Sequence, residues 1–233
     1  MEESLFVINR GRLTQFLAPI GEKGYHCITI PGSVKIIGQE AFRNRNDLGY
    51  VTIPGKVTTI GKWAFGGCEY LQGVSLEPGV MEIAPYAFNF CDRMEEISLP
   101  DTVIGLGRNA FSGCRSLRRV KLSHGLTILA EELFASCGSL CEVELPRNLG
   151  AISKAAFRSC SSLQQVRLPD RLQTIGAEAF AYCGRLRSVT IPGSVVTIGP
   201  RAFQECRSLT IHAPAGSFAE EYARKNKIPF QAI

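Results

Sequence analysis

The chain has 233 residues, of which 45% are hydrophobic and 20% are charged. This apolar content is sufficient for a folded core without disulfide or metal support. The formal charge of +5 at pH 7 is mild for this length, so composition does not indicate nucleic-acid binding. No run of 18 apolar residues occurs, which argues against membrane insertion.

The first 25 residues are predicted to form an N-terminal cap. Phe6-Val7-Ile8 and Leu13-Thr14 predict a hairpin that covers the first repeat. Residues 1–5 are acidic and lack the hydrophobic core of a signal peptide. We therefore expect a cytoplasmic protein if the chain is native at Met1, and a surface or secreted one if an export signal was removed. Nine cysteines, an odd number, favour a reducing compartment.

A 23-residue repeat fills residues 26–211. Its marker is a phenylalanine that recurs every 23 residues without insertion, at Phe42, Phe65, Phe88, Phe111, Phe134, Phe157, Phe180 and Phe203. Cys follows Phe by three residues in seven repeats, Leu or Met follows by six, and Val or Ile by nine. Eight such repeats indicate a solenoid in which neighbouring coils complete one another's core.

Each repeat is predicted to contain one strand and one turn. Residues nine to eleven after Phe alternate apolar, polar and apolar, which predicts a short half-buried strand. A Pro usually ends it, because Pro has no N–H for the ladder. Stacked strands predict one parallel sheet. Phe and Cys at i and i+3 are expected to point inward from a helical turn on the opposite side.

Residues 212–233 are predicted to form a C-terminal cap. Ser217-Phe218-Ala219-Glu220 is a capping box that opens a helix through Lys225. Phe218 and Tyr222, at i and i+4, would lie on one face of that helix. The helix is expected to close the open end of the core.

The repeated cysteines have three interpretations. Zinc needs a tetrahedron of ligands, whereas one cysteine per coil gives a straight row without any CxxC pair. Parallel side chains suit disulfides poorly, and Cys packs well as a small hydrophobe. We favour packing, and predict no cofactor or metal. Cys27 and Cys141 fall outside the row and are candidate exposed thiols. His26 adjoins Cys27 but is expected to point the other way, so a catalytic pair is disfavoured.

The residues eight and ten after each Phe are predicted to form an exposed stripe along the sheet. Its charges alternate between neighbouring strands, with Glu96, Arg119 and Glu142 in one row and Lys121, Glu144 and Arg167 in the other. We favour cross-strand ion pairing that supports the sheet. The alternative is a polar recognition surface, which would include Tyr50.

Three aromatic residues suggest a second candidate surface. Trp63 and Tyr86 precede Phe by two residues in adjacent coils, and Phe90 follows Phe88 by two. Polar residues occupy these positions in several other repeats. We therefore consider an exposed aromatic patch that contacts a partner or a second copy of the chain. Incidental surface apolarity is the alternative.

The pattern Val57-x-x-Ile60-Gly61-x-x-Ala64-Phe65-x-x-Cys68-x-x-Leu71-x-x-Val74-x-Leu76 resembles the BspA-like class of leucine-rich repeats. The resemblance covers nearly the whole chain. It implies bacterial or protist proteins, often surface-exposed and often implicated in adhesion, and it supplies no catalytic residues. The predicted fold is one domain over residues 1–233, an α/β leucine-rich repeat solenoid of right-handed 23-residue coils with both caps.

The predicted function is a non-catalytic module that binds another protein, with bacterial surface adhesion or host interaction as the implied role. No insertion interrupts the period to build a pocket, and the three histidines lie in distant repeats. The alternatives are an intracellular scaffold, a glycan-binding accessory or an enzyme. Self-association is left open. Nucleic-acid binding is disfavoured, because the basic residues are interleaved with Glu and lack stacking aromatics.

Overall fold

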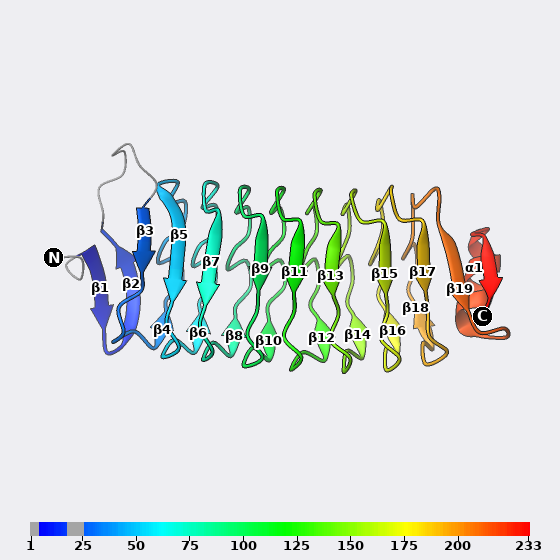
Figure 1. Ribbon diagram of the computed structural model, residues 1–233, viewed down its shortest axis with the longest axis horizontal. Helices are drawn as coiled ribbons and strands as arrows, with labels where there is room; N and C mark the ends of the chain where they lie inside the picture. The colour runs from blue at the N-terminus through cyan, green and yellow to red at the C-terminus, as the bar shows by residue number, and fades with distance from the viewer. Residues whose placement is uncertain (1–4, 18–25) are drawn as a thin grey trace.

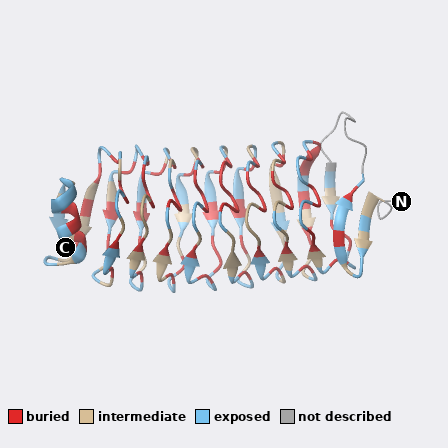
Figure 2. Ribbon diagram, turned by 180° about the vertical axis from the view of Figure 1, so that it is seen from behind, coloured by how far each residue is buried: buried red, intermediate tan, exposed pale blue. Residues whose placement is uncertain are grey.

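The computed structural model describes residues 5–17 and 26–233 of the chain. Successive coils stack along one axis, with the N-terminal hairpin strand β1 (Phe6–Asn9) and the C-terminal helix α1 (Phe218–Asn226) at opposite ends of the solenoid (Figure 1). Buried residues recur at the same places in successive coils (Figure 2). Residues 1–4 and 18–25, which the sequence assigns to the N-terminal cap, lie outside the described residues.

One side of the solenoid carries the strands that the alternating pattern predicts. They are β3 (His26–Thr29), β5 (Leu48–Ile53), β7 (Gly73–Leu76), β9 (Glu96–Ser98), β11 (Arg119–Lys121), β13 (Glu142–Glu144), β15 (Gln165–Arg167), β17 (Ser188–Thr190) and β19 (Thr210–Ala213). One further strand, β20 (Phe230–Ala232), pairs with β19 and was not predicted from the sequence. Neighbours pair in parallel within three hydrogen-bonded groups, β3-β5-β7, β9-β11-β13 and β15-β17-β19-β20. We call the outward side of these strands the strand face.

A second set of parallel strands runs along another side, so the prediction of one sheet was incomplete. Each of these strands has two residues: β4 (Ile36–Ile37), β6 (Thr59–Ile60), β8 (Glu82–Ile83), β10 (Gly105–Leu106), β12 (Ile128–Leu129), β14 (Ala151–Ile152), β16 (Thr174–Ile175) and β18 (Thr197–Ile198). They form the groups β4-β6-β8-β10 and β12-β14-β16-β18. Two residues are too few to show an alternating pattern in sequence.

The segment around each Phe is a series of tight turns, so the predicted helical turn was wrong. Residues two before and two after Phe have positive φ, for example Trp63 at 57° and Phe90 at 57°. Backbone N–H groups bond alternately within a coil and to the next coil. Cys68 N donates to Phe65 O at 3.1 Å, whereas Phe65 N donates to Ala87 O at 2.8 Å. An α-helix would keep all these bonds within one segment.

The repeated phenylalanines form one continuous stack in the core. Ring centroids of neighbours lie between 4.8 Å, for Phe42 and Phe65, and 5.7 Å, for Phe111 and Phe134. Phe16 continues the stack at the N-terminal end, 5.3 Å from Phe42. Stacked rings combine a large buried apolar area with favourable aromatic contacts, so the stack couples each coil to its neighbours.

Each repeated cysteine has a polar role besides packing. Its thiol lies within hydrogen-bond distance of the Phe carbonyl oxygen of the preceding coil, as for Cys68 Sγ and Phe42 O at 3.0 Å. The same contact recurs for Cys91, Cys114, Cys137, Cys160, Cys183 and Cys206. All nine cysteines are free. Among the described residues, no group of three or more His, Cys, Asp or Glu side chains could hold a metal ion.

The buried thiols predict a loss of stability at alkaline pH. Burial raises the pKa of Cys68 from its ordinary value of 9.0 to about 12, and that of Cys206 to about 11. Because the unfolded thiols ionise near pH 9 and the folded ones do not, stability is intact below pH 9. It falls as pH rises towards 11 and 12.

We therefore expect the free energy of unfolding to fall by about 1.4 kcal/mol per pH unit for each buried thiol within that window. Urea denaturation at a series of pH values measures the slope. Cys68→Ala should make it shallower by one thiol, whereas Cys141→Ala, at an exposed position, should leave it unchanged. Equal slopes for Cys68→Ala and the parent would contradict the expectation.

Both ends of the solenoid are capped as the sequence predicts. At the N-terminal end, β1 (Phe6–Asn9) and β2 (Arg12–Phe16) form an antiparallel hairpin, and β2 pairs with β4 in parallel. At the other end, α1 (Phe218–Asn226) begins at the N-cap Ser217, whose side chain accepts a hydrogen bond from Glu220 N. Among the described residues, no helix is long and apolar enough to cross a bilayer.

Tyr222 on α1 terminates the phenylalanine stack. Its ring meets Phe203 edge-on, with centroids 6.1 Å apart. Burial raises the pKa of Tyr222, and a hydrogen bond with the Phe203 backbone opposes this rise.

Candidate partner-binding surface

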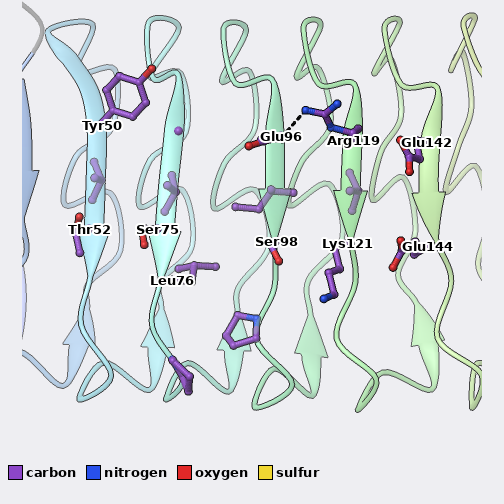
Figure 3. Close-up of a pocket in the computed structure, with 17 residues that line it drawn as sticks. Tyr50, Thr52, Ser75, Leu76, Glu96, Ser98, Arg119, Lys121, Glu142 and Glu144 are labelled. Carbon is purple, nitrogen blue, oxygen red and sulfur yellow. Dashed lines mark hydrogen bonds and ion pairs between the residues drawn. The ribbon is translucent and has the colours of Figure 1, made fainter.

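The strand face presents the predicted polar rows to solvent. Seven candidate residues on strands from β5 to β15 are exposed: Tyr50, Glu96, Arg119, Lys121, Glu142, Glu144 and Arg167. Parallel pairing aligns them in register, since Arg119 lies opposite Glu96 and Glu142, and Lys121 lies opposite Ser98 and Glu144. Figure 3 shows these side chains, apart from Arg167, projecting from neighbouring strands.

Most of the alternating charges on the strand face are not ion-paired. Arg119 Nη2 contacts Glu96 Oε2 at 2.9 Å, and this hydrogen bond raises the pKa of Arg119 (Figure 3). Within the described part of the chain, the side chains of Lys121, Glu142, Glu144 and Arg167 make no ion pair or hydrogen bond. Cross-strand pairing therefore accounts for one pair, between two largely exposed side chains, which contributes little stability.

The strand face is split at two places where neighbouring strands are not hydrogen-bonded, between β7 and β9 and between β13 and β15. At these splits, the inward residues of β7, and those of β13 and the position directly after it, are only partly buried: Val74, Leu76, Val143 and Leu145. Their counterparts on the neighbouring strands are buried, as Ile97 at 2% exposure illustrates. Each split therefore exposes a small apolar floor between polar side chains.

Both splits are hollowed. The first, which we call the first slot, belongs to a groove of about 680 Å³ whose lining includes Val74, Leu76 and Lys121 (Figure 3). The second slot lies in a groove of about 570 Å³ lined in part by Val143 and Arg167. A shallow groove with an apolar floor and polar walls can hold side chains of another macromolecule.

Tyr50 forms one wall of the first groove. Its ring leans over β7, where a Cβ on Gly73 would lie 3.1 Å from the ring (Figure 3). The Tyr50 hydroxyl lies 2.8 Å from Gln72 Oε1, to which it donates a hydrogen bond. Glycine at this position thus leaves room for the ring and keeps the groove open.

The aromatic residues proposed as a second surface lie in the turn segments, away from the strand face. Trp63 and Tyr86 stack on each other with centroids 4.5 Å apart. Arg43 and Arg108 lie over the outer faces of these two rings, at 4.8 Å and 5.7 Å. Both flat faces of each ring are thus occupied within the chain, which leaves mainly ring edges for a partner.

Phe90 differs from the stacked pair, because its side chain is 47% exposed. Its ring lies over Gly113, where a Cβ would approach the ring to 2.4 Å. Phe90 is not part of the stack that Trp63 and Tyr86 form. A single exposed ring supports a binding patch weakly.

The two cysteines outside the row are exposed. Cys141 lines the second slot. The His26 side chain lies outside the described part of the structure, so its predicted orientation stays a prediction. His124 pairs with Asp101 on the surface, and hydrogen bonds from His124 are the main cause that lowers the pKa of Asp101.

Sequence reasoning found the polar rows but missed the two slots. Val74 and Val143 look the same in sequence as the buried valines of other repeats. Gly73 is the one residue whose type could have indicated the first slot in the sequence. A glycine weakens strand β7 at a position where the other strands carry a side chain. No comparable signal marks the second slot.

The stacked 23-residue coils, paired parallel strands and capped ends define a leucine-rich repeat solenoid. The chain belongs to the BspA type leucine rich repeat region family, whose model matches residues 23–103 and 81–210 in six copies. Family and fold are those of a repeat protein-binding module, which agrees with the interpretation of the sequence. No protein with a curated description matches the chain.

Two solved structures are similar to the whole solenoid. A leucine rich cell surface protein of Faecalibacterium prausnitzii is 26% identical over 88% of this chain and 73% of that one, with a TM-score of 0.69. A leucine-rich repeat protein of T. pallidum is 24% identical over 98% of this chain and 96% of that one, with a TM-score of 0.63. The similarity to the T. pallidum protein supports the fold alone.

Proposed function

We propose that this chain is a non-catalytic module that binds another protein through its strand face. The observation that carries the proposal is the set of unpaired charges on β11, β13 and β15. Lys121 and Glu144 lie opposite each other on paired strands, and Arg167 lies across the second split, yet the three side chains make no ion pair with one another. If the charges only stabilised the sheet, we would expect them to form cross-strand ion pairs. On a recognition surface, the same charges are available for contacts with a partner.

A rearrangement of charge at constant net charge tests the strand face. The double variant Lys121→Glu/Glu142→Lys reverses two strand-face charges. Its matched control, Lys154→Glu/Glu131→Lys, reverses two exposed charges near the turn segments. Proteins captured from source cells by the immobilised parent are quantified by mass spectrometry.

We expect at least one protein whose capture falls about tenfold or more with the strand-face variant and is unchanged with the control, because misplaced like charges are costly. Capture that is equal for parent, variant and control would count against the strand face as the binding surface.

We further propose a role in adhesion or host interaction at the bacterial surface. The support is the likeness to a protein described as a cell surface protein. An intracellular scaffold is the alternative. Protease treatment of intact source cells, compared with lysed cells, separates the two. Digestion on intact cells supports the surface role, and protection until lysis supports the scaffold.

A further inference from the structure

The spacing of the two slots on the strand face specifies a partner more closely than a generic protein surface. The first slot lies between β7 and β9, and the second between β13 and β15. The two slots are therefore three strand steps apart. The two steps from β9 to β13 are hydrogen-bonded at about 4.8 Å each, and the halves of the two splits together add a comparable distance, so the slots are separated by about 14 Å or slightly more along the solenoid axis.

An extended peptide that runs along the axis matches this separation. It rises about 3.3 Å per residue, and every second side chain points to the same side. Residues i and i+4 are therefore about 13 Å apart and face the solenoid together. A helix fits poorly, because its same-face residues are separated by about 10.5 Å or about 16.5 Å, for seven or eleven residues.

The strand midway between the slots determines the charge of the central peptide residue. Residue i+2 would lie over β11, which presents Arg119 and Lys121 to solvent. Among the described residues, Arg119 has one ionic partner and Lys121 has none. Glu142 and Glu144 stand on the next strand, about 4.8 Å further along. The position over β11 therefore favours a carboxylate.

We propose that the strand face binds an extended segment of a partner protein in which two apolar residues flank a central acidic residue, each two positions away. The apolar side chains occupy the slots over Val74 and Val143, and the carboxylate contacts Arg119 and Lys121. This inference rests on the proposed use of the strand face for binding and adds the chemistry of its partner.

A random nonapeptide library, displayed on phage and selected on the immobilised full chain, tests the spacing. We expect enrichment of apolar residues four positions apart with Asp or Glu midway. The labelled peptide Gly-Ser-Leu-Ser-Glu-Ser-Leu-Ser-Gly is then measured by fluorescence anisotropy. Replacing either Leu by Ser should weaken its binding about tenfold, because a buried apolar side chain is lost.

Variants of the chain localise the peptide. Ser75→Tyr places a ring in the first slot and should weaken peptide binding at least about tenfold. Its control, Ser136→Tyr, puts the same ring where another coil already carries Tyr182, at the same φ of 62°. Lys121→Glu should weaken binding about fivefold, with recovery when the central peptide residue is Lys, whereas Lys154→Glu should change nothing.

Selection without the four-residue spacing, or binding that ignores Ser75→Tyr, would overturn the inference. A dimer of the chain that Ser75→Tyr dissociates would assign the slots to a second copy, and would overturn it as well. The outcome for the proposed function is distinguishable from the outcome for the peptide pattern. If charge reversal on the strand face still abolishes capture of a protein, that function stands although the peptide pattern is wrong.

Discussion

Phe111→Ala is expected to lower the free energy of unfolding by about 3–5 kcal/mol. The Phe111 ring is fully buried and stacks on Phe88 and Phe134, with centroids 5.4 Å and 5.7 Å away. Its removal leaves a cavity in the middle of a stack whose coils contact only their neighbours. The interface between two halves of the solenoid is therefore weakened on both sides. Urea denaturation followed by circular dichroism measures the loss.

Phe90→Ala is the matched control for this prediction, because it removes the same side chain from an exposed position two residues from the stack. We expect it to cost less than about 1 kcal/mol. A Phe111→Ala protein with the denaturation midpoint of the parent would mean that the stack does not hold the coils together. A second unfolding transition in that variant would show that the two halves have become uncoupled.

The stacked core was predictable from sequence because each coil repeats the same contact. Phe, Cys and Leu recur in phase, so one misassigned residue does not change the register. The backbone of the turns was not predictable. A positive φ is normally signalled by glycine, yet Trp63 and Tyr86 adopt it because hydrogen bonds to the next coil fix the chain there. Such bonds between coils are invisible in a single repeat.

The candidate site was predictable only in part. Alternation places Arg119 and Lys121 outward on a strand, and the structure has them there. Whether their charges are paired depends on side-chain conformation, which no sequence pattern contains. The slots depend on where the stack of strands loses its hydrogen bonds, and Val143 is the same residue type as the buried Val166.

The first coil departs from the repeat in one respect, since Arg45 replaces the cysteine. Its guanidinium donates hydrogen bonds to Asp47 and, at 3.3 Å, to Phe16 O in the N-terminal hairpin. It also lies over the Phe16 ring at 4.8 Å. Arg45 and Asp47 are 7% and 8% exposed. The pair thus connects the hairpin to the first coil, where a preceding coil would otherwise supply a Phe carbonyl oxygen.

Arg45→Ala is therefore expected to lower the free energy of unfolding by about 3–5 kcal/mol, because it removes the guanidinium that is hydrogen-bonded to the buried Asp47 carboxylate. Arg12→Ala, at an exposed position of the hairpin, should change it by less than about 0.5 kcal/mol. Chemical denaturation measures both variants.

The double variant Arg45→Cys/Asp47→Ser separates the cost of removing Arg45 from beside the buried Asp47 carboxylate from the stability that the pair contributes. It gives the first coil the residues that other coils carry at these positions, as Cys114 and Ser116 do. Because both charges are removed together, no desolvated carboxylate remains, and the double variant should lie within about 1.5 kcal/mol of the parent. A double variant as unstable as Arg45→Ala would instead show that the contact between Arg45 and the hairpin, and not the charge balance, stabilises this end of the solenoid.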